Sequence, residues 1–147
     1  MIQRIQSVYL AVALISMGLI LVFPFSTYGD YEFNALGFNN GLSVASLYPL
    51  VYNVIISLIL SLLAIFSFKN RKRQILFSRI NFVVVLILLA VMFWDFNYLK
   101  NSLPIDSSEI SYGIGMFLPI VALISLLMAI RFIVKDEKLI KSMDRIR

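Results

Sequence analysis

The chain has 147 residues, of which 61% are hydrophobic and only 14% are charged. A soluble domain has roughly a quarter of charged residues, and it could not keep this much apolar surface out of water. The absence of cysteine and histidine excludes disulfides, thiol or histidine catalysis, and metal sites built on thiolate or imidazole ligands. The composition therefore predicts an integral membrane protein.

The first apolar run covers residues 5–25 and contains no charged residue. At about 1.5 Å per residue it would extend about 31 Å, the thickness of a hydrocarbon core. A cleaved signal peptide has a shorter apolar core of about 7–15 residues and a small-residue cleavage site, which 23–28 does not offer. We therefore expect a retained transmembrane helix.

The next stretch, residues 26–46, is polar and rich in turn-forming residues. Tyr31, Phe33 and Ala35 alternate with polar residues, a pattern typical of a short strand. An irregular loop with aromatic anchors explains the same pattern equally well.

Three further apolar runs follow, at 47–68, 80–96 and 113–134, and a second polar loop covers 97–112. Pro119 falls about two turns inside the last run and predicts a kink or a late helix start. The sequence thus predicts a single all-α membrane domain over residues 1–147. Its four transmembrane helices would form a bundle, with a small outer cap built from the two polar loops.

Basic residues indicate the orientation of this bundle. The turn Lys69–Arg79 carries five positive charges and no negative charge. Twelve of the 13 basic residues fall on one side of the predicted spans, and Lys100 falls on the other. By the positive-inside rule, both termini and the basic turn are expected in the cytoplasm.

Polar residues within the spans are few. Asn53 and Asn81 lie near opposite span ends, where they either line a path or form hydrogen bonds between helices, at about 1 kcal/mol or less each; we favour hydrogen bonding. Arg79, Asp95 and Arg131 lie near span ends, where long side chains reach the interface.

Small residues form stripes that allow close helix contact. These helix-packing candidates are Ser7, Ala11, Gly18, Ser57, Ser61, Ala122, Ser125 and Ala129. Packing within one bundle is the simpler interpretation, and docking of another membrane protein is the alternative.

Acidic residues of the outer loops match no calcium-binding or magnesium-binding motif, so a solvated acidic face is expected. The chain also contains no nucleophile elbow, phosphate-binding loop, zinc-protease motif or dinucleotide-binding glycine pattern. We therefore predict no catalytic, metal or cofactor-binding residue, and no cofactor.

The tail 135–147 combines an apolar helical stripe with basic residues on another face. It either lies along the inner leaflet and binds anionic lipid, or continues the fourth span and presents its stripe to a partner. Its basic residues could also simply set topology. The residues expected to contact lipid or a partner are Arg71, Lys72, Arg73, Lys135, Lys138, Leu139, Met143, Arg145 and Ile146.

Both chain ends and the central basic segment carry a resemblance. The start M-I-Q-R-I-Q, the segment K-N-R-K-R-Q and the end K-D-E-K-L-I-K-S-M-D-R-I-R resemble an uncharacterised family of short four-helix inner-membrane proteins from Bacteroidota. The resemblance implies a multi-pass protein of the bacterial cytoplasmic membrane and supplies no catalytic residue.

These features favour a non-enzymatic accessory or scaffold subunit of a larger cytoplasmic-membrane complex. A small transporter or channel subunit is the alternative, and a membrane enzyme acting on lipid or peptide is the third possibility. Expected partners are membrane lipids and other integral membrane proteins, whereas a nucleic-acid partner is not expected.

Overall fold

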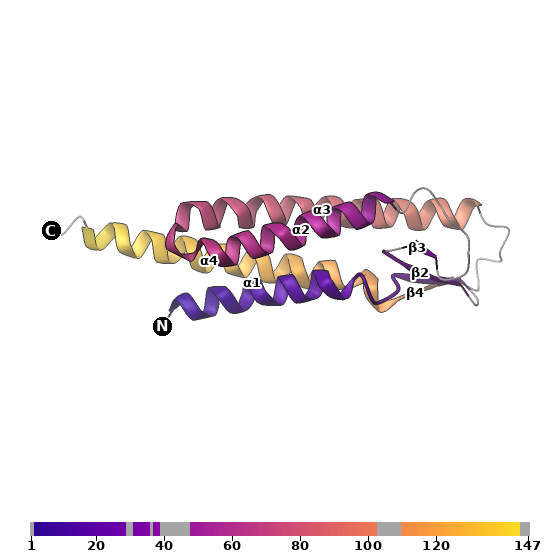
Figure 1. Ribbon diagram of the computed structural model, residues 1–147, viewed down its shortest axis with the longest axis horizontal. Helices are drawn as coiled ribbons and strands as arrows, with labels where there is room; N and C mark the ends of the chain where they lie inside the picture. Colours follow the sequence, from indigo (N-terminus) through magenta and orange to yellow (C-terminus); the bar gives the residue numbers. More distant parts are fainter. Residues whose placement is uncertain (1, 29–30, 36, 39–47, 103–109, 145–147) are drawn as a thin grey trace.

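The computed structural model describes residues 2–28, 31–35, 37–38, 48–102 and 110–144. Four helices dominate it: α1 (Ile2–Leu19), α2 (Tyr48–Phe66), α3 (Arg71–Ser102) and α4 (Leu118–Asp144). They alternate in direction along one long axis (Figure 1). The prediction of four helices is confirmed.

The two ends of the bundle differ. The "connection end" holds the start of α1, the link between α2 and α3, and the end of α4 (Figure 1). The "cap end" holds a small sheet (Figure 1). Helix α1 packs against α4 and α2, and α3 packs against the same two helices. Each helix therefore has two main neighbours, with one core between all four.

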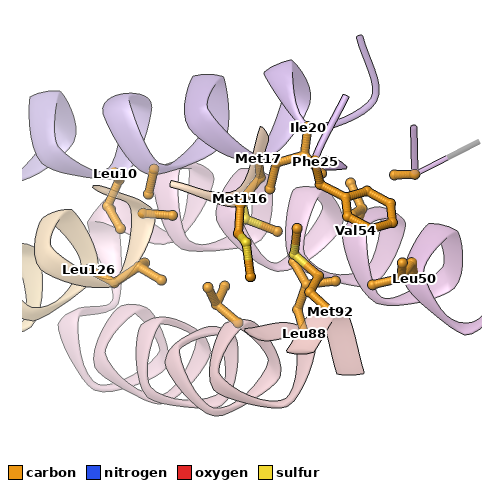
Figure 2. Packing of buried hydrophobic residues seen from close by; sticks show 14 of the residues in the cluster. Leu10, Met17, Ile20, Phe25, Leu50, Val54, Leu88, Met92, Met116 and Leu126 are labelled. Carbon is orange, nitrogen blue, oxygen red and sulfur yellow. The ribbon is translucent and has the colours of Figure 1, made fainter. Parts of the chain in front are cut away.

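The centre of this core is apolar. Leu10 and Met17 of α1, Leu88 and Met92 of α3, and Leu126 of α4 converge there and are almost completely buried (Figure 2). Flexible methionine side chains fill irregular space between the helices, so the middle of the bundle is packed with apolar side chains.

Helix α1 ends at Leu19, six residues before the end of the predicted span at residue 25. The backbone N–H groups of Leu21 and Val22 donate to carbonyls three residues back, as in the tight last turn of a helix. Pro24 lacks an N–H donor and forces the residue before it to be extended. The chain therefore leaves the helix there and enters the sheet.

The sheet is the main departure from an all-α fold. It comprises β1 (Ser26–Tyr28), β2 (Tyr31–Asn34), β3 (Gly37–Phe38) and β4 (Ile110–Tyr112), in the antiparallel order β3-β2-β1-β4. The strand interpretation of the 31–35 alternation is therefore correct. Phe33 is buried whereas Glu32 is exposed, as a strand with one covered face requires. Both predicted loops contribute to this cap, since β4 lies in the second.

Two glycines before α4, Gly113 and Gly115, form backbone hydrogen bonds to the segment that enters β1; we call this contact the cap clasp. Gly113 donates its N–H to the Phe25 carbonyl, and Gly115 donates to the Pro24 carbonyl, both at 2.9 Å. A Cβ atom at Gly115 would lie 2.7 Å from the Phe23 carbonyl oxygen, and one at Gly113 would overlap the Pro24 carbonyl. Only glycine lets the two backbones approach this closely.

The predicted basic turn Lys69–Arg79 is mostly helical. A short 3-10 helix, η2 (Ser67–Lys69), and Asn70 form the whole connection, and α3 begins at Arg71. The Asn70 Oδ1 atom accepts a hydrogen bond from the Arg73 N–H at 3.4 Å, the position of a helix cap. Helix α3 thus starts nine residues before the predicted span, because arginine, lysine and glutamine are good helix formers.

Helix α4 begins late and continues without a break. A 3-10 turn, η4 (Ile114–Met116), precedes it, and Pro119 lies in its first turn, where no helical hydrogen bond is lost. The late start is one of the two outcomes predicted from this proline. The tail continues the fourth helix as far as Asp144.

Three helices are long and apolar enough to cross a membrane, and they cover Leu50–Lys69, Arg71–Asn97 and Ile114–Ile140. The apolar part of α1, Ile5–Leu19, is shorter. All four helices leave large apolar side chains exposed on their outer faces. A surface of this extent suits lipid rather than water.

Candidate functional site

Helix α3 divides the bundle interior into three zones. Seven residues at spacings of three and four form one buried stripe along it: Gln74, Ser78, Asn81, Val85, Leu88, Met92 and Asp95. The three nearest the connection end are polar, the next three are apolar, and the last is a carboxylate. Polar groups therefore enter the interior from both ends, with an apolar zone between them.

The polar zone near the connection end is satisfied by its own hydrogen bonds. Ser57 Oγ donates to Asn81 Oδ1 at 2.7 Å, and Asn81 Nδ2 donates to Ser61 Oγ at 2.8 Å. All three side chains are fully buried. Asn81 therefore joins α3 to α2, as the hydrogen-bonding interpretation proposed, while Asn53 lies half-buried on α2.

A second polar contact joins α1 to α4 at the connection end. Gln6 Nε2 donates to Asp136 Oδ2 and, at 3.3 Å, to the Phe132 carbonyl. Gln6 and Asp136 are only 4% and 6% exposed. The Tyr9 ring stacks on the Phe132 ring, with centroids 5.5 Å apart. Asp136 belongs to the predicted tail 135–147, but the buried stripe Ala129–Ile133–Asp136 places its side chain inside the bundle.

The cap end contrasts with this arrangement. Asp95 is only 3% exposed, and its Oδ2 atom has no hydrogen-bond partner among the described residues. Ser26 of β1 is fully buried, and its Oγ atom likewise has no partner in the described part of the chain. The interpretation that Asp95 reaches the interface is therefore wrong, because its position on the core stripe of α3 turns it inward.

The predicted basic contacts lie at the surface of the connection end. Lys72 and Arg73 of α3 are exposed, as are Lys135 and Lys138 of α4. Arg71 is half-buried, and its Nη1 atom has no partner among the residues that the structure describes. The C-terminal end of α4 extends past the start of α3 and of α1 (Figure 1).

The apolar stripe of the tail is described only in part. Leu139 is 46% exposed on α4. The side chain of Met143, and Arg145 and Ile146 as a whole, lie outside the described residues.

The predicted small-residue stripes occupy different depths. Ser57, Ser61, Ala122, Ser125 and Ala129 are buried between helices. Ser7, Ala11 and Gly18 are half-buried. A Cβ atom at Gly18 would meet nothing within 4 Å in the described structure. On α1 the buried seam instead follows Gln6, Leu10, Ala13, Met17 and Ile20.

The buried polar side chains among the described residues are serine hydroxyls, asparagine and glutamine amides, and two aspartate carboxylates. The described residues hold no group of three or more acidic side chains that could bind a metal ion. The buried polar groups near the connection end are engaged with one another.

Comparison with known protein families places the whole bundle in one group. The family described as a domain of unknown function (DUF4293) matches residues 2–146. The chain belongs to this family. The DUF4293 match includes all four helices and the sheet, so the family corresponds to the complete fold. The predicted membership in an uncharacterised family is confirmed. No curated protein and no solved structure matches the chain.

Proposed function

We propose that this DUF4293 protein is a non-enzymatic accessory or scaffold subunit of a larger complex in the bacterial cytoplasmic membrane. The observation that carries the proposal is the C-terminal end of α4, which extends beyond the rest of the bundle (Figure 1). On the turns before this end, beside the start of α1, α4 exposes Lys135, Lys138 and Leu139. A helix end that extends past its own bundle, next to exposed basic and apolar residues, offers a surface for a partner at the membrane boundary.

The proposed location rests on the apolar exterior and on charge. The connection end holds the basic residues of α4 and those of α3 other than Lys100, whereas the strands of the cap contain no basic residue. The positive-inside rule then orients the connection end toward the cytoplasm. Both termini would lie on that side.

The apolar centre of the bundle favours a scaffold over a transporter. Val85, Leu88 and Met92 form an apolar zone on α3, and Leu10 and Leu126 face them from α1 and α4 (Figure 2). A substrate or ion path would need polar groups at this depth. Among the described residues, the buried polar side chains of α3 lie on either side of this zone, and the buried polar groups next to Met17 and Leu126 on the other helices are the hydroxyls of Ser16 and Ser125.

Orientation can be tested directly because the chain has no cysteine. Ser111→Cys at the cap end and Lys138→Cys at the connection end both replace exposed residues. With a membrane-impermeant maleimide, intact spheroplasts should label Ser111→Cys, and Lys138→Cys should react only after lysis. The reverse pattern would contradict the proposed orientation.

The scaffold role is tested by recovering the tagged full-length protein from its native membrane in mild detergent. A stoichiometric membrane partner is expected with the native chain. The variant Lys135→Gln/Lys138→Gln/Leu139→Ser should lose it, while the control Arg131→Gln should retain it. Recovery of the protein alone under several mild conditions would count against the proposal.

A further inference from the structure

One exposed face of α3 carries cations at its first turn and apolar side chains further along. A phospholipid has the matching arrangement, a charged headgroup followed by acyl chains. Lys72 lies on this face in the first turn, and Leu76, Ile80 and Val83 follow at helical spacing. These three apolar side chains are 54%, 42% and 53% exposed. From Lys72 to Val83 the helix rises about 16 Å, close to half of a roughly 30 Å hydrocarbon core.

The first turn of α3, at the cationic end of this face, supplies no counter-charge of its own. Arg71, Lys72 and Arg73 occupy the first turn of α3, which contains no acidic residue. The N-terminus of a helix carries partial positive charge, so cations in this turn are unfavourable unless an anion is nearby. Arg71 also retains a guanidinium nitrogen without a partner among the described residues.

A fourth cation reinforces the cluster. Arg79 is exposed and lies seven residues after Lys72, on the same face. Helical side chains lean toward the helix N-terminus, and a long arginine can carry its charge to the interface. The reach of the Arg79 side chain therefore extends toward the turn that holds Lys72. Exposed Phe66 and Phe68, in and beside the connection, add apolar surface near the cations.

We propose that this face of α3 binds a glycerophospholipid with an anionic headgroup. Its phosphate would lie against Lys72 and Arg73, with Arg71 and Arg79 beside it, and an acyl chain would run along Leu76, Ile80 and Val83. The inference rests on the proposed membrane location but not on the proposed partner. Lys135 and Lys138 lie on the part of α4 that supports the partner surface and are not required.

The test uses purified full-length protein in detergent with an equimolar mixture of phosphatidylglycerol and phosphatidylcholine, and native mass spectrometry counts the lipids retained. The native chain should retain phosphatidylglycerol about thirtyfold more than phosphatidylcholine, from two basic contacts at an anionic headgroup. Lys72→Gln/Arg73→Gln should reduce this preference to near one. The charge-matched control Lys135→Gln/Lys138→Gln should keep it.

A second variant separates a lipid from a free anion. Leu76→Ser/Ile80→Ser removes the chain contact and keeps every cation, so retention of phosphatidylglycerol should fall at least about tenfold. Unchanged retention would mean that a phosphate group alone is bound and would overturn the proposal. Equal loss in the Lys135→Gln/Lys138→Gln control would overturn it too. Thermal unfolding of each variant verifies folding, and no partner protein is present, so failure of the scaffold proposal would leave these results interpretable.

Discussion

The connection end and the cap end of this bundle are held together by different kinds of contact. At the connection end, side chains from separate helices form hydrogen bonds, as in the Gln6–Asp136 and Asn81–Ser57 pairs. At the cap end, backbone groups form the main polar contacts, and the buried Asp95 carboxylate has an oxygen without a described partner. One end is therefore specified by side-chain chemistry, and the other by close backbone approach.

This difference has an energetic consequence. A side-chain contact between helices can be weakened by one substitution without moving the backbone, whereas a backbone contact fails only when the chains are forced apart. The cap end should therefore tolerate most changes in side-chain chemistry but not added volume at its glycines. The connection end should show the opposite response.

The largest effect is expected at the cap clasp. Gly113→Ala places a Cβ atom against the Pro24 carbonyl and separates the two backbones, which also weakens the hydrogen bond to Phe25. The free energy of unfolding should fall by about 3 kcal/mol, at the upper end of overpacking effects. Denaturant titration of the full-length protein in detergent measures this change.

Gly18→Ala is the matched control, because Gly18 lies within helix α1 and a Cβ atom added there has no neighbour within 4 Å in the described structure. It should raise stability by up to about 1 kcal/mol, the difference in helix propensity between glycine and alanine. Comparable losses of stability in Gly113→Ala and Gly18→Ala would show that the backbone contact at Gly113 leaves room for a Cβ atom.

The clasp also shows what the sequence could and could not predict. Long apolar runs and Pro119 predicted four helices and the late start of α4, because length and proline chemistry are local properties. The contact of Gly113 and Gly115 with Pro24 joins positions about 90 residues apart. No local pattern reveals such an approach, although the G-I-G spacing just before an apolar run was a visible signal.

For the charged residues of the candidate site, too, local sequence patterns predicted exposure better than burial. The basic residues of α3 and α4 were found from charge alone, because an exposed cation needs no particular neighbour. Asp95 was predicted to reach the interface and Asp136 was counted only as part of the tail, because each lies near the end of an apolar run. Only the interior stripes of α3 and α4 show that both are buried. Both aspartates continue the spacing of three and four residues that the buried apolar positions of their helices follow. Applying this spacing to polar residues would have predicted that they are buried.

At the connection end, Asn81→Ala should have the next largest effect. It removes two hydrogen bonds and leaves the buried hydroxyls of Ser57 and Ser61 without this partner. A loss of about 2 kcal/mol is expected from two interhelical bonds and the space left behind. The control Asn97→Ala affects an exposed side chain that donates a hydrogen bond to the Phe93 carbonyl of its own helix. It should change stability by less than about 0.5 kcal/mol, and equal effects would contradict the importance of the cluster.

The smallest effects are expected from replacing a buried aspartate with asparagine, in one variant at the connection end and in another at the cap end. In Asp136→Asn the amide can still accept from Gln6, but it loses the stronger bond that a carboxylate accepts, so stability should fall by about 1 kcal/mol. In Asp95→Asn a buried carboxylate with an unpartnered oxygen becomes an amide, which is less costly to bury, so stability should rise by about 1 kcal/mol. Parallel denaturant titrations at one pH compare the two variants.

Changes of opposite sign in the free energy of unfolding would establish that the two buried carboxylates are held differently. A loss at Asp95 equal to that at Asp136 would instead mean that Asp95 has a bound partner at the cap end, supplied by the membrane or by another molecule.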